Sequence, residues 1–227
     1  MIPTKIKVQK GFRDVFNLFM INPDELHGDL QMPKIAKYTG PIPEKLIDFT
    51  KRPTHPEEFF CHHYLYDYLF DNNDGLWRGR VDESDFYKKR VEHLKEFSGV
   101  ISPDYSVYED MPFVMQLWNI FRSKVICNWL RSQGINCIYN VRWGDYRTYD
   151  AVFDGVEKGS IVAVGSHGSV LNALKRDNFE SGFKEMIKRI EPTKIIVYGA
   201  LTDFIQKICD EKNIEIIHFG GEHRGGK

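Results

Sequence analysis

The chain has 227 residues and a formal net charge of −1, from 31 Lys and Arg against 32 Asp and Glu. A chain of this length can bury a hydrophobic core that needs no disulfide or structural metal to be stable. A content of 42% hydrophobic residues is typical of an ordered chain. Near-balanced charge makes nucleic acid an unlikely partner, because a protein that coats it needs a large basic excess; a local basic groove stays open. With no membrane-length apolar segment and no secretory signal, we expect a cytoplasmic protein.

Proline recurs in the first 55 residues without a strong periodicity. We therefore expect residues 1–55 to form an irregular arm packed on the core, with a strand possible at 45–49. Residues 56–220 are predicted to be the core domain, and 221–227, which are rich in glycine, a flexible tail.

Short apolar runs alternate with segments of helical period through the core. The runs predicted to be strands are 59–67, 100–106, 137–143, 161–167, 194–199 and 215–220. The predicted helices are 85–97, 112–133, a weaker one at 146–153, 178–190 and one that starts at Thr202. This alternation predicts an α/β fold. Its mostly parallel sheet would have about six strands with flanking helices, either open and doubly wound or an incomplete barrel.

Polar residues follow the predicted strands at their carboxyl ends, which is the edge where parallel sheets bind ligands. The candidate catalytic residues are Asp67, Asp104 and His167. The candidate substrate-binding residues are Ser102, Ser106, Gln116, Asn119, Asn140, Arg142, Trp143, Gly165, Ser166, Gly168 and Tyr198. The Gly- and Ser-rich run at 165–169 could cradle an anion with backbone N–H groups, although it lacks the P-loop pattern.

Each candidate also has a structural interpretation. Asp104 follows Ser-Pro and suits a turn, and Arg142 could form a salt bridge with Asp67 or Asp145. Trp143 could pack in the core, and His167 could be hydrogen-bonded in a turn. The helical stripe of Gln116, Asn119 and Ser123 could be a solvated face or could line the site.

The evidence for a metal or a disulfide is weak. Cys61, Cys127, Cys137 and Cys209 are far apart in apolar runs, so we expect core thiols and neither a disulfide nor a zinc site. His62 and His63 would point to opposite faces of a strand. Mg²⁺ bound by Asp67, Asp104 and Asp145 stays open, because no spacing is diagnostic of it.

Two linked blocks carry a resemblance to a known family. They are Ser102-Pro-Asp-Tyr-Ser106 and Asn140-Val-Arg-Trp-Gly144, and the likeness covers most of residues 57–220. The sequence resembles a bacterial and phage family known as domain of unknown function number forty-four seventeen. The resemblance implies occurrence on phages, prophages and other mobile elements, and it brings no established activity.

The leading hypothesis is an enzyme, of hydrolase or transferase type, that acts on a small anionic substrate such as a nucleotide or a phosphate ester. Arg142 would hold the anion, Asp104 or Asp67 would act as the base, and His167 would act as the acid. The main rival is a non-catalytic phage factor that binds a nucleotide or a host protein. The oligomeric state is not indicated by the sequence.

Overall fold

The computed structural model describes residues 14, 16–71, 75–77, 84–166 and 173–221. The candidates His167 and Gly168 and nearly all of the predicted tail lie outside these residues. Seven strands form one parallel sheet: β3 (Leu46–Asp48), β4 (Phe60–His62), β5 (Gly99–Ile101), β6 (Cys137–Asn140), β7 (Ile161–Gly165), β8 (Lys194–Tyr198) and β9 (Glu215–Phe219). A separate antiparallel pair, β1 (Leu26–His27) and β2 (Met32–Pro33), precedes it.

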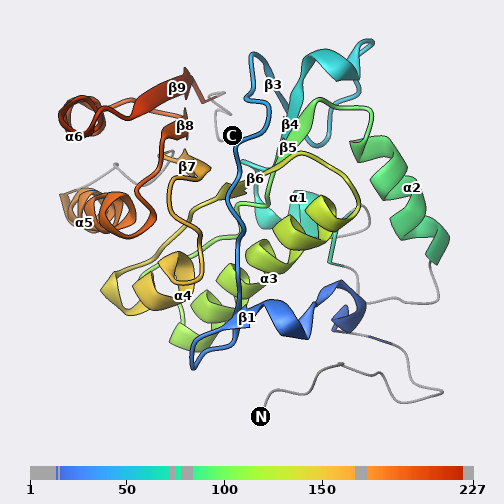
Figure 1. The fold of residues 1–227 in the computed structure, drawn as a ribbon, viewed down its shortest axis with the longest axis horizontal. Coiled ribbons are helices and arrows are strands. Elements are labelled where there is room, and N and C mark those ends of the chain that lie inside the picture. Colours follow the sequence, from blue (N-terminus) through green and yellow to red (C-terminus); the bar gives the residue numbers. More distant parts are fainter. Residues whose placement is uncertain (1–13, 15, 72–74, 78–83, 167–172, 222–227) are drawn as a thin grey trace.

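The order of strands in the sheet is their order in the chain, and the sheet curls into a half-barrel (Figure 1). The prediction of an α/β fold with a parallel sheet is therefore confirmed. Two arrangements of this sheet were predicted, an open doubly wound sheet and an incomplete barrel. The strand order never reverses, so the structure matches the incomplete barrel. The additional strand is β3, which falls in the segment where a strand was predicted as possible.

Helices follow the strands and cover the outer face of the half-barrel (Figure 1). They are α1 (Asp67–Asp71), α2 (Ser84–Leu94), α3 (Phe113–Ser132), α4 (Tyr149–Phe153), α5 (Ala173–Ile190) and α6 (Asp203–Lys212). Short 3-10 turns occupy Leu18–Met20, Pro23–Glu25, Pro56–Glu58 and Tyr146–Thr148. As predicted, Thr202 caps α6, where its side chain accepts a hydrogen bond from Ile205 N–H. Within the described ranges, no helix is long and apolar enough to cross a membrane.

The largest error of the sequence analysis lies between residues 59 and 67. A single strand was predicted, but β4 ends at His62 and α1 begins at Asp67. The chain turns in between, where Leu65 N–H donates to the carbonyl of His63 (2.9 Å). Aromatic residues continue through this turn, so the apolar run gave no sign of the strand end. The predicted strand 100–106 likewise ends at Ile101, and its remaining residues form a loop.

The N-terminal arm packs against the inner face of the half-barrel. Tyr38 N–H donates to Ser160 Oγ (3.0 Å), and the carbonyl of Tyr38 accepts a hydrogen bond from Ile161 N–H (2.9 Å). Tyr38 and Ile42 join a small apolar cluster with inner-face residues such as Ile138 and Ile196. The arm thereby removes from solvent an inner face that the outer helices leave uncovered.

Candidate functional site

A continuous cleft lies along the carboxyl edge of the sheet. Its inner compartment has a volume of about 170 Å³ and is lined by Asp48, His62, Tyr64, Asp104 and Tyr198, among others. Its outer compartment, of about 510 Å³, is lined by Glu109, Trp143, Lys175 and Asn178, among others. Tyr66, Tyr108, Arg142 and Gly165 line both compartments. The edge that the sequence predicted for ligands therefore contains a cavity.

Strand periodicity places the inner compartment at the top of the half-barrel interior. Successive side chains of a strand alternate between faces, so Ile138 and Asn140 share the inner face, as do Ile196 and Tyr198. The lower layer of this face is apolar, whereas β3, β4, β6, β7 and β8 end in Asp48, His62, Asn140, Gly165 and Tyr198, which are polar or lack a side chain. His62 and His63 diverge as predicted: His62 lines the cleft, and His63 is buried with its Nδ1 2.9 Å from the carbonyl of Ile101.

A hydrogen-bonded chain connects the strand ends. Tyr64 donates its phenol proton to Asn140 Oδ1 (2.9 Å), and Asn140 Nδ2 donates to Asp104 Oδ1 (2.7 Å). Burial raises the pKa of Asp104, against the lowering effects of the Arg142 charge and the Asn140 hydrogen bond. Burial also raises the pKa of the Tyr64 phenol, helped by the nearby Asp104 charge. Asn140 thus positions the Tyr64 phenol and the Asp104 carboxylate, although Asn140 itself does not line the cleft.

Aromatic rings form the wall beside this chain. Tyr64 stacks on Tyr198 with a centroid distance of 4.4 Å and an interplanar angle of 7°, and the His62 ring lies 4.8 Å from Tyr198. Gly165 faces Tyr64 so closely that a Cβ on it would stand 3.0 Å from the Tyr64 ring. The absence of a side chain at Gly165 therefore keeps the passage between the two compartments open.

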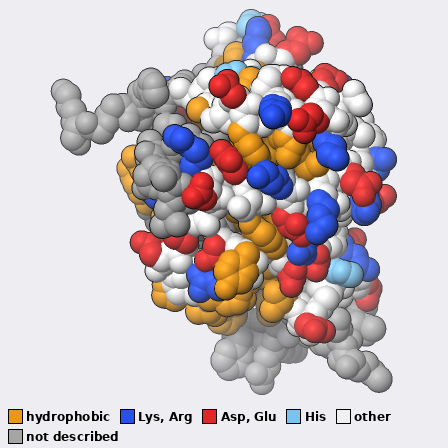
Figure 2. Space-filling view, turned by 90° about the vertical axis from the view of Figure 1, so that its left-hand side faces the viewer, with side chains coloured by type: hydrophobic (Ala, Val, Ile, Leu, Met, Phe, Trp, Pro, Cys, Tyr) orange, Lys and Arg blue, Asp and Glu red, His pale blue; other side chains and the backbone are white. Residues whose placement is uncertain are grey.

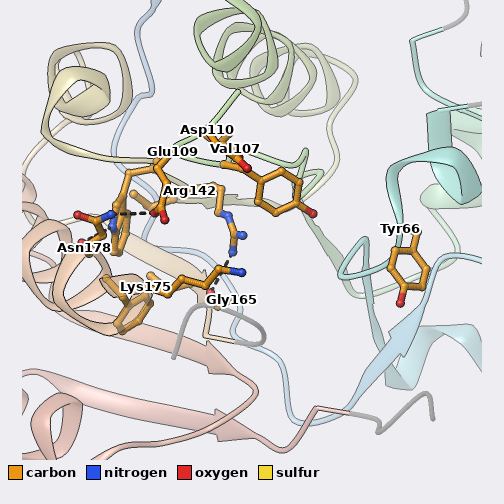
Figure 3. Close-up of a pocket in the computed structure, with 14 residues that line it drawn as sticks. Tyr66, Val107, Glu109, Asp110, Arg142, Gly165, Lys175 and Asn178 are labelled. Atoms are coloured by element: carbon orange, nitrogen blue, oxygen red, sulfur yellow. Dashed lines mark hydrogen bonds between the residues drawn. The ribbon is translucent and has the colours of Figure 1, made fainter. Parts of the chain in front are cut away.

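Two cationic side chains extend towards Gly165 from different elements. Arg142 follows β6, and Lys175 lies in the first turn of α5 (Figure 3). One terminal nitrogen of Arg142 lies 3.5 Å from the carbonyl oxygen of Gly165. Across the outer compartment, Glu109 accepts a hydrogen bond from Asn178 Nδ2 (2.8 Å), and Tyr66 lies on the far side of the cleft (Figure 3). Arg142 and Lys175 thus bring two cationic groups to the junction of the compartments, while the carboxylates of Glu109 and Asp110 also line the outer one.

Several sequence candidates shape the loop after β5. Asp67 accepts hydrogen bonds from the backbone N–H (3.1 Å) and the hydroxyl (2.9 Å) of Ser106. Asn119 Nδ2 donates to the carbonyl of Ser106 (2.6 Å), and Ser123 donates to that of Pro103 (2.8 Å). The polar stripe of α3 is therefore a buried clamp on the loop that carries Asp104, not a solvated face. Ser106 also lines the inner compartment, whereas Asp67 supports it from behind.

Other candidates hold the strands and their loops in place. Ser102 Oγ accepts a hydrogen bond from Asn140 N–H (2.9 Å), and Ser166 donates to the carbonyl of Ala200 (2.8 Å). Gln116 Nε2 donates to the carbonyl of Met111 (2.9 Å). These three side chains are buried and line neither compartment.

Trp143 lines the outer compartment but is largely enclosed. Its indole N–H donates to the carbonyl of Asn178 (3.2 Å), and its ring stacks on Phe179 at 5.4 Å. Gly182 makes room for it, because a Cβ there would overlap the indole ring. The ring is thus part of the packing between α5 and the sheet, and a role in stacking on a ligand stays a prediction.

The three carboxylates considered for Mg²⁺ have separate partners. Asp67 binds Ser106, Asp104 binds Asn140, and Asp145 pairs with Arg147 at 2.7 Å. In the part of the chain that the structure describes, no three His, Cys, Asp or Glu side chains are grouped to hold a metal ion. All four cysteines are buried thiols, which confirms their predicted place in the core.

The cleft residues that the sequence analysis missed include Asp48, His62, Tyr64 and Lys175. Asp48 ends β3, so it would have been found if the strand-end argument had been applied to the possible strand at 45–49. Tyr64 was hidden inside the overlong strand 59–67. Lys175 was missed because the helix was predicted to begin at residue 178, whereas α5 begins at Ala173.

The surface view in Figure 2 shows Lys and Arg side chains interspersed with Asp and Glu. The described residues of this face therefore offer no broad single-sign area. A continuous basic stripe is what a nucleic-acid backbone requires. The two cationic side chains of the cleft, Arg142 and Lys175, form a local pair in a compartment that Glu109 and Asp110 also line.

The fold and the cleft together define a half-barrel α/β protein with a cavity at the carboxyl edge of its sheet. The chain belongs to the family described as "Domain of unknown function (DUF4417)", whose model matches residues 24–220. It is 29% identical to the "Gene 1 protein" of Mycobacterium phage L5 over 67% of this chain and 60% of the relative. It is 27% identical to the "Gene 1 protein" of Mycobacterium phage D29 over 91% of this chain and 71% of the relative.

The chain thus spans about three fifths of the L5 relative's length. No solved structure matches it significantly. The comparisons place the chain in an uncharacterised family with phage members, and they assign no reaction or substrate to it.

Proposed function

We propose that the protein is an enzyme that acts on a small phosphate ester, a nucleotide or a related compound, in this cleft. The observation that carries the proposal is that Arg142 and Lys175 both extend towards Gly165 (Figure 3). The half-buried Asp104 lines the adjoining inner compartment. Two cations from separate elements can hold a phosphoryl group, and a neighbouring carboxylate can take a proton from an attacking hydroxyl.

Asp104 suits the role of general base better than the other sequence candidate, Asp67. Asp104 lines the cleft, and burial raises its pKa towards the range in which a carboxylate accepts protons effectively. Asp67 accepts hydrogen bonds from both the backbone and the hydroxyl of Ser106, and it does not line the cleft. Asp67 is therefore a positioning residue in this proposal.

The test measures binding and turnover separately. Calorimetric titration with inorganic phosphate and a panel of nucleotides and sugar phosphates gives affinities, and mass spectrometry follows product formation over time. We expect Arg142→Ala and Lys175→Ala each to weaken binding by about tenfold or more. Arg176→Ala is the matched control, because Arg176 is exposed beside Lys175 and lines neither compartment.

Asp104→Asn separates an enzyme from a binding protein. We expect this variant to keep phosphate-ester binding and lose turnover, since the amide preserves the shape of the side chain and cannot accept the proton. Binding without product in the wild-type protein would contradict the enzyme and support a sequestering factor. Equal affinity in the wild type, Arg142→Ala and Lys175→Ala would contradict the anion site itself.

A further inference from the structure

The cleft has two compartments of different chemistry that meet at Gly165. The cations Arg142 and Lys175 reach this junction, and Lys175 belongs to the outer compartment alone. The inner compartment has the carboxylates of Asp48 and Asp104 and the ring of Tyr198. Glu109 and Asp110 also line the outer compartment, so an anion fits best at the junction, where Arg142 and Lys175 meet. A second anion between the inner carboxylates would be repelled.

We propose that the inner compartment is a sugar subsite, so that the ligand is a sugar phosphate or the ribosyl phosphate part of a nucleotide. This inference rests on the proposed anion site and specifies what the phosphate is attached to. The phosphate would lie at Arg142 and Lys175, and the hydroxyl-bearing ring would lie beside Asp104 and Tyr198.

The acceptor groups of the inner compartment call for a ligand with hydrogen-bond donors. An ionised carboxylate only accepts hydrogen bonds, and Asp104 uses Oδ1 for Asn140, while Oδ2 lies on the side that faces Gly165. The hydroxyls of Ser106 and Tyr108, 3.1 Å apart, add groups that both donate and accept. Sugar hydroxyls also donate and accept, which satisfies such a mixed set.

The aromatic wall fits the other face of a sugar. The Tyr64 and Tyr198 rings are stacked on each other, and both line the inner compartment together with His62. The C–H face of a sugar ring packs well against aromatic carbon. The compartment is also small: about 170 Å³ corresponds to the volume of roughly six water molecules. It suits one ring rather than a chain of them.

Gly165→Ala tests the division of the cleft. The new methyl group would stand 3.0 Å from the Tyr64 ring and 3.5 Å from Asp104 Oδ2, so it would narrow the entrance to the inner compartment. Tyr64 cannot retreat easily, because Tyr198 is stacked behind it. Gly220→Ala is the matched control, since a Cβ at Gly220 would meet no atom within 4 Å.

The experiment compares the affinities for inorganic phosphate, ribose 5-phosphate and AMP by calorimetry. We expect the wild type to bind ribose 5-phosphate about tenfold or more tightly than phosphate, and Gly165→Ala to lose this advantage, so that the two affinities of the variant become nearly equal. If Gly165→Ala does not fold, Asp48→Asn replaces it and is expected to reduce the same advantage, because Asp48 lines the inner compartment and not the outer one.

Each other outcome is decisive. Equal binding of phosphate and ribose 5-phosphate by the wild type would overturn the sugar subsite and leave the anion site standing. Tight binding of AMP but not of ribose 5-phosphate would overturn it in favour of a base-binding compartment. If the wild type bound none of the three probes, the proposed function would fail as well.

Discussion

Asp104 has different surroundings at its two carboxylate oxygens. Oδ1 accepts a hydrogen bond from Asn140, whereas Oδ2 faces Gly165 across the entrance to the inner compartment. Burial raises the pKa of this carboxyl, and the charge of Arg142 and the amide of Asn140 lower it. Such opposed influences are typical of carboxylates that transfer protons, so the hydrogen bond from Asn140 is a means of setting the pKa of Asp104.

We expect Asn140→Ala to raise the pKa of Asp104 further, because the ionised carboxylate loses a donor while its burial remains. Titration of the side-chain carboxyl by ¹³C NMR measures this pKa directly. A turnover that needs ionised Asp104 would then decline at a higher pH than in the wild type. Asn136→Ala is the control, since Asn136 is an exposed amide that donates to the carbonyl of Ser98. An unchanged or lower pKa in Asn140→Ala would contradict this account.

Helix α3 supports the carboxyl edge of the sheet through buried polar contacts. Arg122 donates to Asp71 (2.6 Å) and to Asn119 Oδ1 (2.7 Å), and its guanidinium lies 3.8 Å from the centre of the Tyr105 ring. Asn119 in turn holds the carbonyl of Ser106. The helix thereby ties α1 to the loop after β5, and the position of Asp104 depends on this connection.

We expect Arg122→Met to lower the free energy of unfolding by about 3 kcal/mol, because Asp71 Oδ2 and Asn119 Oδ1 both lose the guanidinium that donates to them. Urea denaturation measures the change. Arg147→Met breaks an exposed pair with Asp145 and serves as the control, with a much smaller loss expected. An equal loss of unfolding free energy in both variants would mean that the buried contacts of Arg122 stabilise the protein no more than the exposed Arg147 pair does.

Element types were easier to predict than element ends. The strands 161–165 and 194–198 were recognisable because the first is continuously apolar and the second is so after Lys194, as central parallel strands are. The end of β4 was not, since a hydrophobic run continues from the strand into a turn made of Tyr64 and its neighbours. The site residues were predicted from the positions where elements end. Arg142 and Tyr198 were found because the ends of β6 and β8 were placed nearly correctly, and Tyr64 and Lys175 were missed because the end of β4 and the start of α5 were not.

The contacts between segments that are distant in the chain could not be predicted from the sequence for another reason. Nothing in the local pattern of α3 distinguishes a solvated stripe from a buried clamp, because Asn119 and Ser123 are polar in both cases. The loop they hold lies on a different element, and its carbonyl groups set the partners. The register of the sheet, by contrast, follows from the alternation that places Asn140 on the inner face and Tyr139 on the outer one.

One lysine, Lys124, is fully buried on α3, among the helices that cover the outer face of the half-barrel. Lys124 of α3 donates to the carbonyl of Asp154 (2.9 Å), and burial lowers its pKa from 10.5 to about 7. The folded protein therefore prefers the neutral amine. Stability from this group is fully present above pH 10.5 and is lost as the pH falls towards 7, a difference of about 5 kcal/mol.

We expect Lys124→Met to be more stable than the wild type at pH 7, by an amount that shrinks between pH 7 and 10.5. The thioether side chain has a similar length and carries no charge to desolvate, although the carbonyl of Asp154 loses its donor. Chemical denaturation at several pH values gives the difference in unfolding free energy. A difference that stays constant with pH would show that Lys124 keeps its ordinary pKa in the folded state.

The strand order also bears on how the protein is made. Every strand of the large sheet pairs with the strand before it in the chain, and a polypeptide leaves the ribosome amino end first. Each new strand can thus join an edge that has already emerged. The cavity is different, because Asp48 lies on the first of these strands and Tyr198 on the last but one. A nascent chain therefore possesses most of its scaffold before it possesses a complete binding site.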